Sequence, residues 1–390
     1  MIWRNFMKEL AIYVHIPFCV QKCRYCDFLS GPAHLDKMDE YINMLLVEME
    51  QYGELVKAYK IRSIFLGGGT PSILSVHQIK RVMGGLQKLV GDRMIPDAEV
   101  TIESNPGTLT EEKLRAYLES GINRISMGLQ STFDEELKNL GRIHTFEGFL
   151  EGYSLARKAG FKNINVDLMS GLPNQTLHKW ETTLKRVIAL EPEHISAYGL
   201  IIEEGTEFEK VYGTEAGEME LPGEELDRLM YQRTKETLKE AGYERYEISN
   251  YAKPGFESRH NCTYWTGVSY LGIGLGASSL LRKKRYRNEE NMRYYLEKLS
   301  ENKTVKNLEE ELDKADEMEE FMILGLRMMK GVQKKEFEKR FGQTVEAVYG
   351  EAIEKLIQLK MLAETGDRLY LTEQGINVSN EVFTNFLKIT

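Results

Sequence analysis

A regular alternation of short β-branched runs with longer helical segments is the feature that most constrains the fold of this chain. Six apolar runs occur in its first half, at 11–16, 61–66, 98–102, 124–129, 164–169 and 194–200. Between them, apolar residues recur with helical spacing, and we expect helices at 38–49, 76–90, 111–120, 146–158 and 177–190. Strands that alternate with helices predict a parallel sheet in the α/β class. Six such units predict a partial (β/α)6, TIM-like barrel, with a flat doubly wound sheet as the alternative.

Each predicted strand runs directly into a polar or glycine-rich cluster. The clusters are the cysteine-containing segment after residue 16, then 67–72, 103–106, Gln130, 167–173 and 198–199. Barrels of this kind place their active site at the carboxyl ends of the strands, so we expect one site built from all six clusters. The glycines at 67–69 lack the spacing of a nucleotide-phosphate loop, but they allow backbone to approach a ligand closely. We therefore expect Gly69→Val to obstruct a ligand without disturbing the barrel.

Three cysteines form a Cys-x3-Cys-x2-Cys run at Cys19, Cys23 and Cys26. Three thiolates occupy three irons of a [4Fe–4S] cluster and leave the fourth iron open to another ligand. An open iron beside the sulfonium of S-adenosylmethionine (SAM) is the arrangement needed for reductive cleavage of SAM, and the run resembles the signature of the radical-SAM superfamily. The alternative is a structural zinc site with a fourth ligand from elsewhere in the chain. The candidates for that ligand are His15, His260 and Cys262.

Composition excludes several classes of protein. The chain has 390 residues, of which 42% are hydrophobic and 28% charged, as in ordinary soluble globular proteins. A net charge of −9 disfavours nucleic-acid binding. Clustered cysteines, and an N-terminal decapeptide without an apolar core, predict a reducing, cytoplasmic location and no secretory signal. The basic run at 282–287 is expected to be a solvated turn, or else to contact tetrapyrrole propionates or the surface of a membrane.

Four segments together resemble the oxygen-independent coproporphyrinogen III oxidase branch of the superfamily, and the resemblance extends over nearly the whole chain. These segments lie at 13–19, 65–72, 126–131 and 167–173. The resemblance implies a [4Fe–4S] cluster on the three cysteines, an electron donor, and SAM. The implied SAM contacts are Tyr13, Tyr25, Gly68, Gly69, Thr70, Glu103, Gln130, Arg142, Asp167 and Gly199. From their chemistry alone, Glu103 and Asp167 suit ribose hydroxyls or an ammonium group, and structural capping or ion pairing is their alternative role.

Two features separate the chain from the oxidases themselves. The oxidases carry Gly-Cys after the third cluster cysteine, where this chain has Asp27-Phe28, and they have a longer extension than the 18 residues before Cys19. Both features resemble the HemW-type haem chaperones, as does the His-Asn-x-x-Tyr-Trp run that begins at His260. This resemblance implies haem binding, haem-acceptor proteins as partners and no coproporphyrinogen decarboxylation. An oxidase that decarboxylates coproporphyrinogen III is the alternative function.

Within the His-Asn-x-x-Tyr-Trp run, the histidine has two interpretations. His260 is a candidate axial ligand of haem iron, with Tyr264 and Trp265 packed on the macrocycle. Alternatively, His260 makes structural hydrogen bonds. Cys262 is expected to be a small buried residue.

The sequence suggests three parts, a barrel at 1–240, a barrel-associated segment at 241–308 and a C-terminal module at 309–390. Nine glutamates at 203–225 predict a surface excursion, followed by a helix at 224–241 and a strand near 243–248. The sequence of the C-terminal module predicts helices followed by a β-hairpin that turns at Gly366-Asp367, which is typical of a winged-helix-like fold. From residue 331 onward, eight Lys and Arg are balanced by nine Asp and Glu, so a structural or lid role is favoured over DNA binding.

Overall fold

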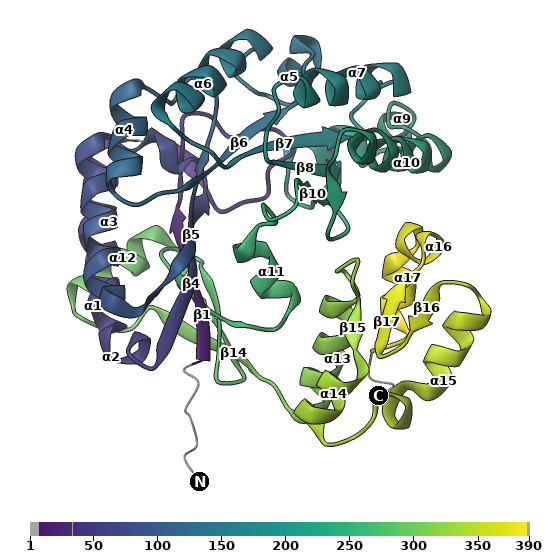
Figure 1. The fold of residues 1–390 in the computed structure, drawn as a ribbon. Coiled ribbons are helices and arrows are strands. Elements are labelled where there is room, and N and C mark those ends of the chain that lie inside the picture. The colour runs from purple at the N-terminus through teal and green to yellow at the C-terminus, as the bar shows by residue number, and fades with distance from the viewer. Residues whose placement is uncertain (1–7, 33, 388–390) are drawn as a thin grey trace.

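The computed structural model describes residues 8–32 and 34–387, and it places the six predicted strands side by side in one curved sheet (Figure 1). They are β1 (Lys8–Ile16), β4 (Tyr59–Gly68), β5 (Met94–Ser104), β6 (Arg124–Gln130), β7 (Ile164–Ser170) and β8 (His194–Gly199). Every neighbouring pair in this order is parallel. The crossover helices lie on the outer face of the curved sheet, so the partial barrel is confirmed. Residues 1–7, within the segment predicted to lack a secretory signal, lie outside the described residues.

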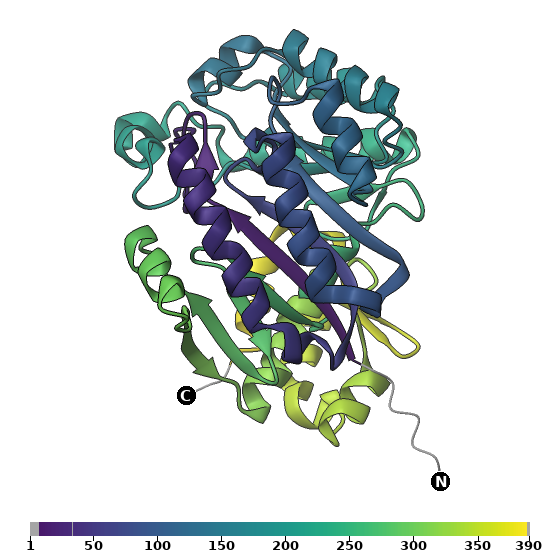
Figure 2. The same cartoon turned by 90° about the vertical axis from the view of Figure 1, so that its left-hand side faces the viewer.

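The crossover helices begin and end where the sequence pattern predicts, within a few residues. They are α1 (Leu35–Gln51), α3 (Val76–Val90), α4 (Glu111–Glu119), α6 (Phe146–Ala159) and α7 (Leu177–Ile188), with short α2 (Gly53–Val56) and α5 (Asp134–Asn139) between them. Helix α3 begins with a capping box between Ser75 and Gln78. Helix α6 ends at Gly160, whose φ of 111° requires glycine. Helix α1 lies along the outer face of the sheet (Figure 2). Its residues Tyr41, Ile42 and Leu45 are fully buried, so the apolar stripe faces the core.

Short strands extend both edges of the barrel sheet. The strand β11 (Ser269–Ile273) runs parallel to β1, and β12 (Ser278–Leu281), β13 (Lys284–Asn288) and β14 (Lys306–Glu311) follow it as antiparallel neighbours, with α12 (Met292–Ser300) before β14. At the other edge, β10 (Asn250–Ala252) and β9 (Glu244–Arg245) pair antiparallel beyond β8. The single strand expected near 243–248 is therefore a two-stranded reversal, in which the Tyr246 N–H donates to the Asn250 carbonyl at 3.2 Å.

The basic run at 282–287 spans the β12–β13 turn and strand β13, and acidic side chains neutralise most of it. The ion pairs are Lys283–Glu317, Lys284–Glu311, Arg285–Glu310, Arg285–Glu320, Arg287–Glu290 and Arg287–Glu309. Strand β14 supplies three of these glutamates from the neighbouring position in the sheet. Apart from Arg282, which forms no ion pair with a described residue, the run therefore offers little net positive charge to propionates or to an anionic membrane.

Helix α11 (Arg259–Trp265) lies inside the barrel and carries the His-Asn-x-x-Tyr-Trp run (Figure 1). The buried carboxylate of Glu99 on β5 holds its N-terminus: it accepts bonds from the backbone N–H of Arg259 at 3.0 Å, the N–H of His260 at 3.1 Å and the Ser258 hydroxyl at 3.2 Å. The buried guanidinium of Arg124 on β6 lies 4.0 Å from the same carboxylate. The helix is thus anchored to the sheet from within the barrel.

The C-terminal module has its own apolar core. It consists of α13 (Lys314–Gly325), β15 (Val332–Gln333), α14 (Lys334–Phe341), α15 (Val345–Gln358), β16 (Leu362–Thr365), β17 (Arg368–Leu371), α16 (Glu373–Asn377) and α17 (Ser379–Thr384). The predicted hairpin is formed by β16 and β17, with Gly366 at φ 59° in its turn. Strand β15 pairs with β17, so helices α13, α14 and α15 and a small sheet give the winged-helix-like arrangement.

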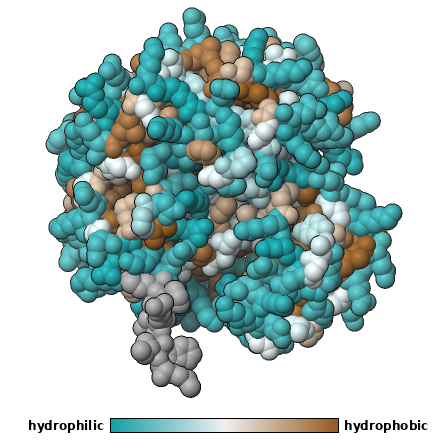
Figure 3. Space-filling model, viewed as in Figure 1, coloured by the Kyte–Doolittle hydropathy of each residue, from teal (hydrophilic) through white to brown (hydrophobic). Residues whose placement is uncertain are grey.

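The molecular surface is largely polar on the face shown in Figure 3, with apolar side chains in separate smaller patches. The acidic stretch after β8 forms α8 (Glu207–Tyr212) and α9 (Glu215–Glu218) before α10 (Glu224–Glu240), which matches the predicted helix. Among the described residues, no helix is both long and apolar enough to span a membrane.

Candidate cofactor site at the strand ends

The carboxyl ends of the barrel strands surround a cavity of about 130 Å³. The predicted site residues that line it are Cys19, Cys23, Tyr25, Cys26, Gly68, Gly69, Thr70, Glu103, Gln130, Arg142 and Asp167. They come from the loop after β1 and from the ends of β4, β5, β6 and β7, with Arg142 between α5 and α6. Clusters that are up to 148 residues apart in sequence therefore meet in one place, as expected for parallel strands of a barrel.

The cysteine loop is tied to neighbouring parts of the barrel. The short strands β2 (Phe18–Cys19) and β3 (Gly31–Pro32) pair beneath it, and the backbone N–H of Arg24 donates to the Leu140 carbonyl at 3.0 Å. The Thr70 hydroxyl lies 3.5 Å from the Cys19 sulfur. Burial raises the pKa of the Cys26 thiol to about 11, so that thiol must release a proton when it binds a metal.

The arrangement of the thiols bears on the choice between a cluster and zinc. In the described part of the chain, no three His, Cys, Asp or Glu side chains converge as ligands of a single metal ion do. All three thiols nevertheless line the same cavity. A [4Fe–4S] cube takes one thiolate at each iron and needs its ligands spread around it, whereas zinc draws four ligands to one point. Three thiols around one cavity are the donor set that a [4Fe–4S] cube with one open iron takes.

The glycine-rich turn is built against the chain's own cysteine loop. The Gly69 N–H donates to the Ile16 carbonyl at 2.9 Å, and the Thr70 N–H donates to the Phe18 carbonyl at 2.7 Å. A Cβ at Gly69 would lie 2.5 Å from the Phe18 carbonyl oxygen, which is backbone and cannot move aside cheaply. The expectation that Gly69→Val would leave the fold undisturbed is therefore wrong, and its effect on SAM binding stays a prediction. The side chain would displace the loop that carries Cys19.

We expect Gly69→Ala to lower cluster content as well as SAM binding, because even one methyl group pushes the backbone at Phe18 away from β4. Iron and sulfide per chain after anaerobic reconstitution would measure the effect. Gly84→Ala on α3 is the matched control, since a Cβ there meets nothing within 4 Å. The control should keep the cluster and stabilise the helix by about 0.5–1 kcal/mol. A fully loaded Gly69→Ala protein would contradict the packing argument.

Two carboxylates are buried inside the cavity. Glu103 accepts the Gly68 N–H at 3.1 Å, and Asp167 accepts bonds from Asn165 at 2.7 Å and Ser126 at 3.2 Å. Neither carboxylate forms an ion pair within the described residues. Burial, and secondarily the charge of Asp167, raises the pKa of Glu103 to about 8, and burial raises the pKa of Asp167. A cationic group on a ligand would offset the free-energy cost of ionising these two buried carboxylates.

Arg142 supplies the opposite charge at the same cavity. Its Nη1 donates to the Asn105 side chain at 2.9 Å and its Nη2 to the Gly128 carbonyl at 3.2 Å, while its buried Nε has no partner among the described residues. A Cβ at Gly128 would lie 2.7 Å from Nη2, so this contact requires glycine. The cavity thus offers an anion-binding donor opposite two cation-binding carboxylates. A zwitterionic amino-acid ligand such as the methionine part of SAM carries the complementary charges.

Asn105 was not among the predicted site residues. Its Nδ2 donates to the Thr70 hydroxyl at 2.9 Å, and its Oδ1 accepts from Arg142, so it joins the glycine-rich turn to the arginine. The signal available in the sequence was its position in the polar cluster at 103–106, two residues after Glu103.

Gln130, which was predicted, stands at φ 73° where β6 departs from regular pairing with β7. A non-glycine residue in this conformation is strained, and such strain is concentrated at functional sites.

Two of the predicted SAM contacts, Tyr13 and Gly199, lie outside this cavity. The Tyr13 hydroxyl bonds to His15 Nδ1 at 3.0 Å, and Tyr13 lines a separate cavity with Tyr264 and Tyr270. Gly199 ends β8 and is exposed, with no atom within 4 Å of the position its Cβ would take. Their assignment as SAM contacts stays a prediction.

His260 is buried, with both ring nitrogens occupied. Nδ1 bonds to the Ser63 hydroxyl at 2.9 Å and Nε2 bonds to the Tyr264 hydroxyl at 3.0 Å. Burial, aided by the charge of Arg124, lowers the pKa of His260 to about 3, so the ring is neutral. This geometry matches the structural interpretation and presents no free nitrogen to haem iron. Cys262 is half-buried, and burial raises its pKa to about 11.

Known proteins with similar sequences identify the family. The Radical SAM superfamily model matches residues 13–187, and the HemN C-terminal domain model matches residues 312–378. Heme chaperone HemW of Lactococcus lactis subsp. lactis (strain IL1403) is 37% identical over 97% of this chain and 98% of its own length. Heme chaperone HemW of Bacillus subtilis (strain 168) is 36% identical over 97% of this chain and 99% of its own length. The chain belongs to the HemW family.

The solved structure of coproporphyrinogen III oxidase (HemN) from Escherichia coli is similar in fold to this HemW-family chain. It superposes with a TM-score of 0.85 over 98% of this chain and 91% of its own length, at 24% identity. That likeness shows the shared fold. The radical SAM domain implies a [4Fe–4S] cluster and SAM, for which the cavity at the strand ends provides thiols, carboxylates and a guanidinium.

Proposed function

We propose that this chain is a haem chaperone: it binds haem, passes it to acceptor proteins, and holds a [4Fe–4S] cluster and SAM at the strand ends of the barrel. The observation that carries the proposal is identity of 36–37% along 97% of the chain to relatives named heme chaperone HemW. The sequence after the cluster cysteines supports it. Asp27-Phe28 stands where the resembling oxidases have Gly-Cys, and Phe28 is 60% exposed on the cavity wall.

The residues at the strand ends fit both cofactors. Cys19, Cys23 and Cys26 would hold the cluster, which when bound supplies the electron for reductive cleavage of SAM. Arg142 would bind the SAM carboxylate through its unpartnered Nε, and Glu103 would bind the ammonium group. Gln130 and Asp167 would contact the ribose. An electron-donor protein is a further partner, because the cluster must be reduced.

The affinity for SAM is expected to rise with pH between about 6 and 7.5. Because the pKa of Glu103 is raised to about 8, this carboxyl is mostly protonated in the ligand-free protein over this pH range. The proton must leave before the carboxylate can bind the ammonium group of SAM. An α-ammonium stays charged until about pH 7.7–8.0. We therefore expect the affinity to increase nearly tenfold from pH 6 to pH 7, with close to one proton released per SAM bound.

Calorimetry in buffers of different ionisation enthalpy measures both the affinity and the released proton. Glu103→Gln should bind SAM more weakly at pH 7.5, with an affinity that no longer rises with pH. Glu111→Gln on the exposed start of α4 is a matched control and should keep the pH dependence. An unaltered pH profile in Glu103→Gln would remove Glu103 from the ammonium site.

The function is tested with anaerobically reconstituted full-length protein. Titration with haem should give a saturable Soret change, and transfer to an apo-haem protein should follow. Incubation with coproporphyrinogen III, SAM and reductant should give no protoporphyrinogen. Product formation at rates of enzyme turnover would make the oxidase the correct function, and failure to bind haem would contradict the chaperone.

A further inference from the structure

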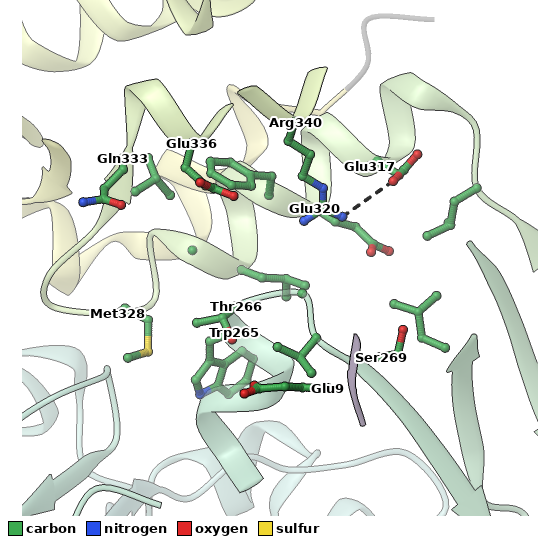
Figure 4. A pocket seen from close by; sticks show the side chains of 18 of the residues that line it. Glu9, Trp265, Thr266, Ser269, Glu317, Glu320, Met328, Gln333, Glu336 and Arg340 are labelled. Carbon is green, nitrogen blue, oxygen red and sulfur yellow. Dashed lines mark ion pairs between the residues drawn. The ribbon is translucent and has the colours of Figure 1, made fainter. Parts of the chain in front are cut away.

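A large cavity lies at the opposite end of the barrel from the cofactor site. It measures about 660 Å³, within the usual range for small-molecule pockets of about 300–1,000 Å³. One wall is formed by the starts of β1 and β4 and by the end of α11, and the other by α13, α14 and the segment between them (Figure 4). Strand β1 starts in this cavity at Lys8 and ends beside the cofactor site at Ile16, so about 25 Å separates the cavity from the cofactor site.

The end of α11 contributes an aromatic surface to this cavity. Trp265 is partly exposed and lines it together with Phe321, Leu324 and Met328. Figure 4 shows Trp265 at the end of α11, across the cavity from the helices that carry Glu320 and Arg340. The guanidinium of Arg327 lies 4.4 Å from the indole centre. The buried indole Nε1 has no hydrogen-bond partner in the part of the chain that the structure describes. The tryptophan of the His-Asn-x-x-Tyr-Trp run is therefore presented to a cavity, whereas its histidine is not.

The charges around the cavity leave an excess of cations. Each lining carboxylate has a basic partner: Glu9 pairs with Arg62, Glu317 with Lys283 and Arg340, Glu320 with Arg285, and Glu336 with Lys339. Four other lining residues form no ion pair with any described residue. They are Lys8, Arg282, Lys330 and Arg368. An apolar, aromatic cavity with uncompensated cations at its rim suits a flat ligand that carries two carboxylates.

We propose that haem binds in this cavity between α11 and the C-terminal module, with Trp265 against the macrocycle and Lys330 and Arg368 near the propionates. The inference rests on the proposed function. It places haem about 25 Å from SAM, so haem binding and the chemistry at the cluster take place at separate sites. The residues that line the cavity include no histidine or cysteine within the described chain. The thioether of Met328 is the soft ligand on its wall, and methionine is an axial ligand in other haem proteins.

The test is haem titration of the full-length reconstituted protein and three variants. Thr266→Trp puts a large side chain into the cavity from an exposed position after α11, and we expect at least tenfold weaker haem binding. The double variant Lys330→Glu, Arg368→Glu reverses the rim charge and should weaken binding about as much. Met328→Leu should keep haem in the cavity and change its Soret band. Protoporphyrin without iron should bind the unaltered chain and Met328→Leu equally.

Two further variants serve as controls. Lys162→Glu alters an exposed lysine that lines none of the cavities described above, and His260→Ala removes a buried ring; folded protein of either kind should bind haem as the unaltered chain does. Cluster content and SAM affinity confirm folding, since all these changes lie away from the strand ends. Unaltered haem affinity in both Thr266→Trp and the charge-reversed variant would overturn this site and leave the proposed function standing. Absence of haem binding by the unaltered chain would overturn both.

Discussion

Replacing Cys19, Cys23 or Cys26 with alanine is expected to abolish the iron–sulfur cluster. Anaerobically reconstituted protein should contain about four iron and four sulfide per chain, and each variant should contain close to none, because a cube held by two thiolates exposes two irons. Iron and sulfide analysis with visible absorption measures the loss. Since burial holds the pKa of the Cys26 thiol near 11, reconstitution should also be slower at lower pH.

The fourth cysteine provides the control for this prediction. Cys262 lies on α11 and lines a different cavity, with Met329 and Arg62, so Cys262→Ala should keep a full cluster. Loss of the cluster in this variant would mean that Cys262 acts as a ligand. Stoichiometric zinc without sulfide in the unaltered protein would instead support a structural zinc site.

Replacing Glu99 with alanine is expected to destabilise the barrel by about 3–5 kcal/mol. The change leaves the buried guanidinium of Arg124 without its counter-charge, and removing one partner of a buried ion pair typically has this effect. It also removes the acceptor of three donors at the start of α11. Urea denaturation followed by circular dichroism measures the free energy of unfolding.

Asp97→Asn is a matched control, because Asp97 also pairs with α11, through Arg259, but at the surface. An exposed ion pair of this kind contributes about 0–1 kcal/mol. A similar loss of stability in both variants would mean that the anchoring of α11 does not depend on the buried carboxylate. Glu99→Ala should also lose haem binding, since Trp265 occupies the far end of the same helix.

Local patterns in the sequence determined the barrel and much of its site. The run at 124–129 matched β6, which is buried at every position, because a strand covered on both faces is rich in apolar residues. The stripe at Tyr41 and Leu45 matched α1 because a helix buries one face. The spacing of the three cysteines and the polar clusters after each strand predicted the cavity that Glu103, Arg142 and Asp167 line. In parallel strands the carboxyl ends meet at one edge, so order along the chain is enough to bring these clusters together.

Contacts between distant segments were decided only by the tertiary structure. The sequence does not reveal that Gly69 packs on the Phe18 carbonyl, that Asn105 joins Thr70 to Arg142, or that β14 lies beside the basic run. His260 could be read as a ligand until Ser63 and Tyr264 were found on its two nitrogens. The physical reason is that a side chain's role depends on which groups surround it once strands and helices have packed, and that packing brings together residues whose spacing in the chain carries no local signal.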